Sequence, residues 1–345
     1  MSAIQRVKEA IEEIKKGNMI IMLDDEDREN EGDLVYSATL SDDKKVNFMA
    51  THAKGLICTA VTAQTAKRLD LNPMVDSNTS SYETAFTVSV DCANATTGIS
   101  AKERDDTIRI LANPISKAIE LVRPGHIFPL IAKDGGTLVR TGHTEGSVDL
   151  CKLAGLAGEA VICEIMKDDG TMARRDDLDI FSQKHNMKQV YISDIIEYRM
   201  AYETLIKEIS IEDMKFFGID TKKRVFKDHL NNEHIVIQFG DLSKESFVKF
   251  HNVEPDINLF LNENSLSSMT NSIEYLKNNN GILVFLDNQH ENSNIIKDFG
   301  IGAQILNYLK IENIKLITSS KKHSFVGING FGLAIIEEIT TDSLK

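Results

Sequence analysis

An acidic segment follows the first apolar run of the chain directly. Residues 24–33 read Asp-Asp-Glu-Asp-Arg-Glu-Asn-Glu-Gly-Asp, with seven carboxylates among ten residues, and the apolar residues 19–23 precede them. A strand that leads into such a loop holds carboxylates at the end of a rigid element, where a hard divalent cation can bind. The alternative is a solvated acidic loop.

Four members of this segment are candidates for chemistry: Arg28, Glu29, Glu31 and Asp33. On an extended segment the three carboxylates share one face, since the side chains of a strand alternate. Converging carboxylates repel one another unless a cation or an arginine compensates them. The segment therefore predicts a metal site, a base for proton abstraction, or both. We assign no role to residues 24–27.

A second candidate cluster reads Arg140-Thr141-Gly142-His143-Thr144-Glu145-Gly146 and precedes a helix that we expect to begin near Ser147. Small and hydroxyl residues before a helix favour phosphate binding, because the free N–H groups and the helix dipole attract anions. Arg140 could add a bidentate contact, and the imidazole of His143 could bind a metal that a carboxylate also holds. The alternative is a glycine-rich turn with a surface arginine.

Three further segments carry polar groups beside apolar elements. His126, in Arg123-Pro124-Gly125-His126, could act as a general acid or base, or be a strand-end histidine bonded to the backbone. Glu164 lies in the apolar run 160–166, where a carboxylate is costly unless it faces a site, a buried network or water. Residues 95–104 place hydroxyl and basic groups at a helix start, a second candidate anion site. Together these clusters indicate metal-assisted proton chemistry on a phosphorylated hydroxy-carbonyl compound.

These residues need a scaffold, and the hydrophobic pattern predicts mixed strands and helices. A helix over residues 4–14 should end at Gly17, because apolar residues recur there at helical spacing. Expected strands cover residues 19–23, 55–62, 86–90, 126–132 and 159–166, and expected helices cover 100–111, 147–156 and 177–185. This mixture argues for an α/β (α+β) fold, with a mixed sheet and surrounding helices.

The second half of the chain is expected to form another α/β domain. A long helix over residues 193–209 should close the first domain, with a linker near 214–223. Further strands are expected at 234–239, 257–261, 282–286 and 314–317, and helices at 269–277 and 301–309. A chain of 345 residues is long enough for two domains, which we place at 1–207 and 208–345.

Composition narrows the function classes. The formal net charge of −13 disfavours binding to a nucleic-acid backbone. No apolar run approaches the ~18 residues of a membrane span, and the first residues lack the apolar region of a signal peptide, so we expect a cytoplasmic location without membrane attachment. The four cysteines, at positions 58, 92, 151 and 163, form no Cys-x-x-Cys pair.

These segments resemble the 3,4-dihydroxy-2-butanone 4-phosphate synthases of riboflavin biosynthesis. The resemblance covers about residues 3–200 and rests on Leu23–Asp33, Asn78-Thr79, Thr97–Ala101, Arg123–His126, Gly142–Glu145 and Asp168–Arg174. It implies a lyase that converts D-ribulose 5-phosphate to 3,4-dihydroxy-2-butanone 4-phosphate and formate. It also implies Mg²⁺ or Mn²⁺, two ions per active site, and a homodimer whose active sites draw on both subunits.

By position, the resemblance implies a role for each candidate residue. Glu29 and His143 match the family's metal ligands, and His126 and Glu164 match residues essential for catalysis. The implied substrate contacts are Arg28, Glu29, Asp33, Arg140, Thr141, Gly142, His143, Thr144 and Glu164. We interpret Asp33 or Glu31 as the base that removes the proton beside the substrate carbonyl, with His126 and Glu164 moving protons in later steps.

The second domain resembles the C-terminal half of GTP cyclohydrolase II in the segments Asp298–Leu306 and Gly330–Leu333. That enzyme needs three zinc-binding cysteines and a catalytic segment ending Gln-Glu-Gly-Arg-Gly. Here no cysteine follows Cys163, and residues 287–294 read Asp-Asn-Gln-His-Glu-Asn-Ser-Asn. We therefore expect no zinc and no cyclohydrolase activity, and a role in assembly or regulation. The alternatives are a bifunctional enzyme with an unusual GTP site, or a protein that mainly binds or scaffolds.

Overall fold

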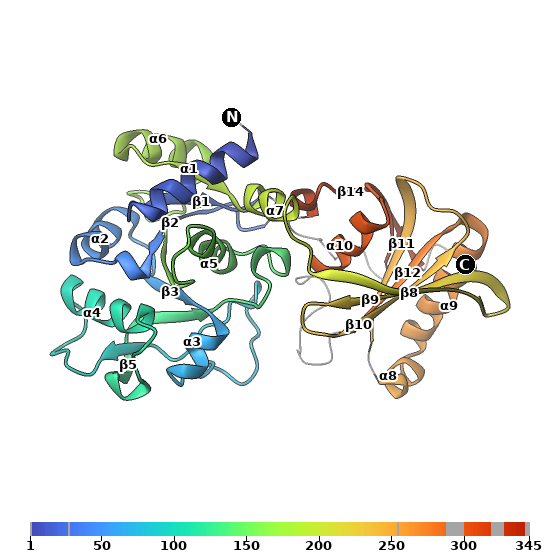
Figure 1. The fold of residues 1–345 in the computed structure, drawn as a ribbon, viewed down its shortest axis with the longest axis horizontal. Coiled ribbons are helices and arrows are strands. Elements are labelled where there is room, and N and C mark those ends of the chain that lie inside the picture. The colour runs from blue at the N-terminus through green and yellow to red at the C-terminus, as the bar shows by residue number, and fades with distance from the viewer. Residues whose placement is uncertain (1, 27, 254, 288–299, 319–327, 342–345) are drawn as a thin grey trace. The chain divides into compact units, whose positions relative to one another are not determined.

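Two seven-stranded sheets, each with its own helices, organise the part of the chain that the structure describes (Figure 1). The computed structural model describes residues 2–26, 28–253, 255–287, 300–318 and 328–341. The chain divides into two compact units, Met1–Ala201 and Tyr202–Lys345. The expected division after residue 207 falls inside the first strand of the second sheet.

The first sheet has the strand order β4-β5-β3-β6-β2-β1-β7. The pairs β1/β7 and β3/β5 are parallel and the other pairs are antiparallel, so the predicted mixed sheet is confirmed. Its strands are β1 (Ile20–Leu23), β2 (Gly32–Ser37), β3 (Cys58–Val61), β4 (Val90–Cys92), β5 (Leu121–Ile131), β6 (Ala160–Glu164) and β7 (Gln189–Tyr191).

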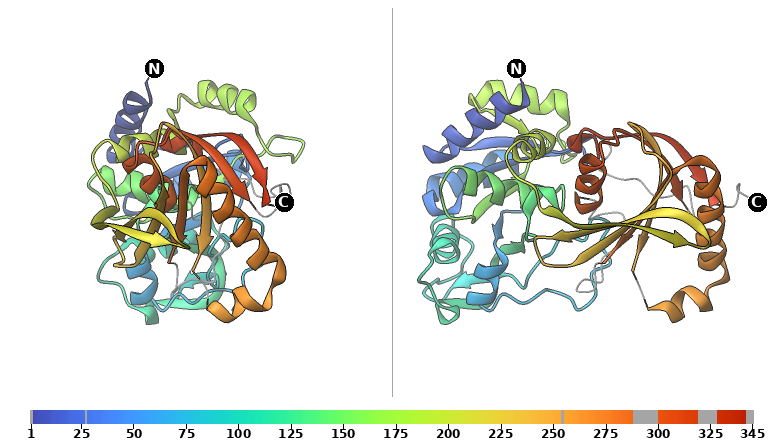
Figure 2. Two further views of the ribbon diagram at one scale, coloured as in Figure 1. Left: turned by 90° about the vertical axis from the view of Figure 1, so that its right-hand side faces the viewer. Right: turned by 45° about the vertical axis from the view of Figure 1, so that its right-hand side comes forward.

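Helices cover both faces of this sheet. On one face α5 contacts β1, β2, β3 and β6, and α1 and α7 pack beside it, as Figures 1 and 2 show from three directions. The helices of the unit are α1 (Ala3–Lys15), α2 (Asp43–Phe48), α3 (Ala63–Arg68), α4 (Ala101–Ala112), α5 (His143–Leu153), α6 (Arg175–His185) and α7 (Ile192–Met200), with the short turns η1 (Ala38–Leu40), η2 (Met49–Ala53), η3 (Ala118–Glu120) and η4 (Gly136–Leu138).

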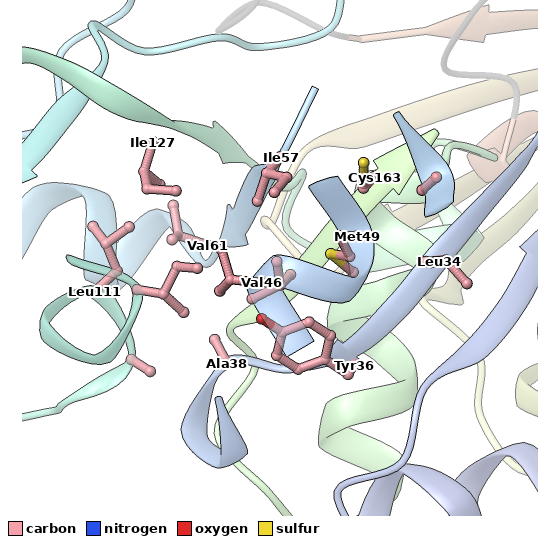
Figure 3. Packing of buried hydrophobic residues seen from close by; sticks show 14 of the residues in the cluster. Leu34, Tyr36, Ala38, Val46, Met49, Ile57, Val61, Leu111, Ile127 and Cys163 are labelled. Atoms are coloured by element: carbon pink, nitrogen blue, oxygen red, sulfur yellow. The ribbon is translucent and has the colours of Figure 1, made fainter. Parts of the chain in front are cut away.

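The other face packs onto a hydrophobic core. Leu34 and Tyr36 of β2 join Val46, Met49 and Cys163 in this core (Figure 3). Because side chains of a strand alternate, the neighbouring residue Asp33 points to the opposite face, where α5 lies. Burial of the core side of β2 therefore directs a carboxylate toward the first turn of α5.

The second sheet has the order β14-β13-β11-β12-β10-β9-β8, and α9 packs against its strands β11 and β12. The strands are β8 (Ile206–Phe216), β9 (Ile219–Asp228), β10 (Glu233–Phe239), β11 (Glu245–Asn252), β12 (Gly281–Leu286), β13 (Asn313–Thr318) and β14 (Ala334–Thr340). The helices are α8 (Asp256–Leu261), α9 (Glu263–Asn279) and α10 (Gly300–Tyr308), with the turn η5 (Ile328–Phe331). No helix among the described residues is long and apolar enough to cross a membrane.

Several predicted elements need correction at the junction between the units. The predicted helix over 193–209 ends at Met200, and the predicted linker at 214–223 lies in the hairpin of β8 and β9. Cross-strand ion pairs, Glu212 with Lys223 at 2.9 Å and Asp213 with Lys222 at 2.7 Å, support this hairpin. The apolar residues before Ile206 recur at helical spacing, so the sequence predicted a continuous helix where strand β8 begins.

Three further predictions differ from the structure. Helix α5 begins at His143 rather than near Ser147, because Gly142 is its N-cap residue. The predicted strand over 257–261 is helix α8, and the strand expected at 86–90 is represented by isolated bridges at Phe86 and Thr87 followed by β4. The helix over 100–111 is confirmed, and the Ser100 hydroxyl caps it by accepting a hydrogen bond from the Glu103 N–H at 3.2 Å.

Candidate active site

A cavity of about 300 Å³ opens where the acidic loop, β2, β6 and the start of α5 meet. It is lined by Arg28, Glu29, Glu31, Asp33, Cys58, Tyr82, Thr84, Phe86, Leu130, Arg140, His143, Thr144, Ile162 and Glu164. Eight residues predicted from sequence therefore meet at one place. Thr141, Gly142 and His126 do not line this cavity.

The acidic loop is fixed from within by Asp24, for which the sequence suggested no role. This buried carboxylate accepts hydrogen bonds from the N–H groups of Glu29 (3.0 Å) and Glu31 (2.9 Å) and from Nη1 of Arg28 (2.9 Å). The loop is thus folded around a buried carboxylate, and the alternative of a solvated acidic loop is wrong. Its neighbour Asp27 lies outside the described residues.

Arg28 is held between the loop and a distant segment. Its Nη1 lies 3.0 Å from Oε2 of Glu29, and its guanidinium stacks over the ring of Tyr82, 5.0 Å from the centroid. The Tyr82 hydroxyl donates to the carbonyl of Arg28 at 2.8 Å. The sequence did not predict this contact, because Tyr82 lies among polar residues more than 50 positions after Arg28.

Arg140 is buried, so the alternative of a surface arginine is wrong. Its Nη1 forms an ion pair with Glu145 in the first turn of α5, and its Nη2 donates to the carbonyl of Tyr82 at 2.9 Å. A Cβ on Gly142 would lie 2.2 Å from Nη1 of Arg140 and 2.8 Å from Oε2 of Glu145. Glycine at position 142 is therefore required for the Arg140–Glu145 pair.

His143, in the first turn of α5, stands between two carboxylates. Its Nδ1 lies 3.7 Å from Oε2 of Glu29, and its Nε2 lies 4.0 Å from Oδ1 of Asp33. Burial alone would lower the pKa of this imidazole, but the carboxylates of Asp33 and Glu29 outweigh burial and raise it to about 9. Burial would raise the pKa of Glu29, but the neighbouring His143 and Arg28 lower it to about 2.

Asp33 and Glu164 are direct cross-strand neighbours in the antiparallel pair β2/β6. Burial raises the pKa of Asp33 to about 8; the charge of His143 opposes this rise, and Glu164 adds to it. Oε2 of Glu164 accepts a hydrogen bond from the N–H of Leu56 at 2.8 Å. A Cβ on Gly55 would lie 2.3 Å from the Glu164 carbonyl oxygen, so glycine lets this backbone approach.

The donor set suits a hard divalent cation. Ligand atoms of Asp24, Glu29 and His143 lie within 4.8 Å of one another. Nε2 of His143 and Oδ1 of Asp33 are buried, and neither has a hydrogen-bond partner among the described residues. Asp24 already holds the loop, so Glu29 and His143 are better placed to bind an ion. Both would have to be deprotonated, so binding would displace the proton from His143.

His126 belongs to a separate polar group on β4 and β5. Its Nδ1 lies 2.7 Å from Oδ2 of Asp91, and its N–H donates to Oδ1 of Asp91 at 2.8 Å. A Cβ on Gly98 would lie within 3 Å of both side chains, so the Thr97-Gly98 segment packs directly on the pair. Asp91 was missed in the sequence, although a carboxylate in an apolar strand is the same signal that identified Glu164.

Comparisons with known proteins identify the family of the chain. The family model for 3,4-dihydroxy-2-butanone 4-phosphate synthase matches residues 8–198, and that for GTP cyclohydrolase II matches residues 290–340. A 3,4-dihydroxy-2-butanone 4-phosphate synthase of Sulfurospirillum multivorans is 58% identical over 97% of this chain and 94% of its own length.

Two solved structures are similar as well. RibBX of A. baumannii, described as a two-domain 3,4-dihydroxy-2-butanone 4-phosphate synthase, is 35% identical with a TM-score of 0.69, over 97% of this chain and 98% of its own. A synthase in complex with two magnesium ions is 38% identical with a TM-score of 0.55, over 57% of this chain and 97% of its own. The chain therefore belongs to the 3,4-dihydroxy-2-butanone 4-phosphate synthase family of riboflavin biosynthesis.

Proposed function

We propose that the cavity between the acidic loop, β6 and α5 converts D-ribulose 5-phosphate to 3,4-dihydroxy-2-butanone 4-phosphate and formate. The observation that carries this proposal is the pair of unbonded buried atoms, Nε2 of His143 and Oδ1 of Asp33, between Glu29 and Glu164. A substrate or cation that fills this space would satisfy both atoms.

The chain's own residues suit proton transfer. A divalent cation bound by Glu29 and His143 would polarise the substrate carbonyl and acidify the adjacent C–H. Asp33, once ionised, can accept the C3 proton, which yields an enediol, and Glu31 is the other candidate base. Glu164 faces the same cavity and can return or accept a proton later. Arg28, Arg140 and Thr144 lie where a phosphate could bind, beside the N-terminus of α5.

The assignment of Asp33 as the first base can be tested directly. Replacing Asp33 by Asn should stop exchange of the substrate's C3 proton with solvent, as followed by NMR in D₂O with Mg²⁺. Replacing Glu31 by Gln should leave measurable exchange. Undiminished exchange in the Asp33→Asn variant would exclude Asp33 from this role.

We further propose that the protein is a homodimer in which His126 serves the cavity of the partner. His126 does not line the cavity of its own chain, and its side chain is 43% exposed. Apolar side chains in the segment before β5 and at its start are also exposed, including Ile115 at 81%, Ile119 at 84% and Val122 at 47%. Such a patch on a biosynthetic enzyme suits a contact with a second copy.

Mixed dimers test this arrangement. The variants His126→Asn and Glu29→Gln should each be inactive, and mixing them should restore about a quarter of wild-type activity, since half of the dimers are mixed and each has one intact site. Absence of restored activity, with subunit exchange verified by mass spectrometry, would contradict a shared site.

We propose that Mg²⁺ or Mn²⁺ is the metal, with two ions per site, and that the enzyme works in the cytoplasm. The similar synthase with two magnesium ions supports the metal and its number. The carboxylate-rich donor set is the kind that both ions prefer. Titration of the metal-free protein with Mn²⁺, followed by electron paramagnetic resonance, should give a stoichiometry of two.

For the second unit we propose the loss of cyclohydrolase activity. No cysteine follows position 163, so a thiolate zinc site cannot form. His234 is fully buried, and its Nδ1 accepts a hydrogen bond from the N–H of Asp287 at 3.1 Å, while His290 lies outside the described residues. Incubation with GTP should release no formate, and metal analysis should find no stoichiometric zinc. A fragment ending at Ala201 should retain synthase activity; loss of that activity would show that the second unit is needed for assembly or regulation.

A further inference from the structure

The acidic loop is also bound from its outer side, by Arg174. Nη1 of Arg174 donates to the backbone carbonyl of Glu29 at 2.7 Å and to that of Asn30, and it lies 3.8 Å from Oε1 of Glu31. One guanidinium nitrogen thus contacts three consecutive residues of the loop.

These contacts complement those of Asp24 on the inner side. The carboxylate of Asp24 accepts hydrogen bonds from the N–H groups of Glu29 and Glu31, whereas Arg174 donates hydrogen bonds to the carbonyls of Glu29 and Asn30. Asn30, between Glu29 and Glu31, is in the left-handed region with φ of 53°, a backbone conformation that asparagine adopts more readily than most residues. Asp24 therefore orients the peptide group before Glu29, and Arg174 orients the peptide group after it. Both residues bind the peptide group between Asn30 and Glu31.

Arg174 is itself held by a rigid part of the unit. It is the N-cap residue of α6, and its N–H donates to Oδ2 of Asp177 at 3.0 Å. The preceding residue, Ala173, donates to the carbonyl of Ile165 at the end of β6 at 3.0 Å. Helix α6 also packs closely on the start of β2, because a Cβ on Gly32 would lie 2.5 Å from Cδ1 of Leu178.

We propose that Arg174 is a positioning residue that holds the backbone of the acidic loop in place. The side chains of Glu29 and Glu31 then point into the cavity in the geometry that cation binding needs. This inference rests on the proposed function of Glu29 as a metal ligand. Arg174 does not line the cavity, so it acts through the loop backbone. Nη1 of arginine carries its two N–H groups in a fixed plane, whereas the ammonium of lysine rotates freely on a flexible stem, so lysine would hold the two carbonyls less well.

The test compares Arg174→Ala and Arg174→Lys with a matched control on the same loop. Glu26→Gln removes the exposed ion pair of Glu26 with Arg175, at 3.2 Å, and leaves the carbonyls of Glu29 and Asn30 bound. Hydrogen–deuterium exchange of residues 24–33 is measured in the metal-free protein, and Mn²⁺ affinity is measured by electron paramagnetic resonance. Activity is recorded as kcat and as the Mg²⁺ concentration for half-maximal rate.

Arg174→Ala should speed exchange of the loop amides while leaving β6 unchanged, and weaken Mn²⁺ binding about 10-fold, the range found for residues that support a metal ligand. Arg174→Lys should be intermediate, and saturating Mg²⁺ should restore most of kcat. Glu26→Gln should match the wild type. Wild-type exchange and Mn²⁺ affinity in both Arg174 variants would overturn the inference, and so would an equal change in Glu26→Gln.

The Arg174→Lys variant carries the test if Arg174→Ala does not fold. Loop exchange in the metal-free protein is independent of the reaction, so it separates the two proposals. If the wild type had no synthase activity but the Arg174 variants still showed faster loop exchange, the role of Arg174 in the loop would stand. Only the proposed function would then be contradicted.

Discussion

The two units bury charge in different ways. In the first unit, Arg28, Arg140 and His143 each have a carboxylate within 4.0 Å, and all of them surround one cavity. In the second unit, Lys249 of β11 is only 8% exposed, and no ion pair or side-chain hydrogen bond is found between its ammonium group and another described residue. Burial alone lowers the pKa of this lysine to about 8.

This difference shows which buried charges indicate a site. A network of opposite charges around a cavity, with two unbonded atoms facing each other, can gain a ligand and is then satisfied. Lys249 lies in register with the apolar residues Leu283 and Ile317 of the neighbouring strands. A single buried amine of this kind reduces stability and offers no second group for chemistry. Perturbed groups are therefore informative when they converge, and less so when they stand alone.

The largest effect is expected for Glu164. Replacing it by Gln should lower kcat by about 10²–10⁴-fold, the usual contribution of a general acid or base. The same change removes repulsion with Asp33 across the strand pair, so the melting temperature should stay the same or rise. Formate release and thermal unfolding would be measured on one preparation. Loss of activity together with a lower melting temperature would point to a structural role.

Gly55→Ala should have the next largest effect. The added Cβ would meet the backbone oxygen of Glu164 at 2.3 Å and its Oε2 at 2.6 Å, so the strand or the side chain must move. We expect kcat/KM to fall about 10–100-fold and the free energy of unfolding to fall by about 1–3 kcal/mol, as in other overpacked sites.

Gly158→Ala is the matched control for this variant, because its nearest contacts are the side-chain ends of Thr62 and Lys152. It should retain near wild-type kcat/KM. If both variants lost the same activity, the effect would be general and would not concern the placement of Glu164.

In the second unit, Lys249→Met should raise stability and leave catalysis unchanged. Methionine keeps most of the volume and removes the unpaired amine, so the free energy of unfolding at pH 7 should rise by about 1–3 kcal/mol. Because the folded-state pKa of Lys249 is below the value in the unfolded chain, the wild type should gain stability between about pH 8 and pH 10.5. The variant should lack that gain. Urea unfolding at pH 7 and pH 9.5 tests this; equal pH dependence in both proteins would contradict it.

The smallest effect is expected for Glu103, an exposed carboxylate at the start of α4. Hydrogen bonds from Thr96 and Ser100 lower its pKa to about 2. A group with a lowered folded-state pKa stabilises the fold above its unfolded value, near 4.5, and this contribution is lost as the pH falls toward 2. Glu103→Gln should therefore destabilise the protein slightly at pH 7 and less at pH 2.5, as measured by thermal unfolding.

Much of the site could be predicted from residue types and local spacing. The acidic loop, His143, Arg140 and Glu164 stand out because carboxylates and cations beside apolar runs are costly without a partner. The fold class followed from mixed strand and helix patterns. The junction between the units could not be predicted, because the segment after Met200 has a helical pattern and becomes a strand only by pairing with β9.

The sequence by itself determined which side chains were available for chemistry, and that no thiolate site can form after Cys163. The tertiary structure decided which of them meet. Strand register set Asp33 beside Glu164, and the folding of the loop gave Asp24 and Arg174 their roles. The same structure separated His126 from the cavity and paired it with Asp91. Residue type and spacing are local properties, whereas register, burial and the pKa shifts that follow from burial depend on contacts between distant segments.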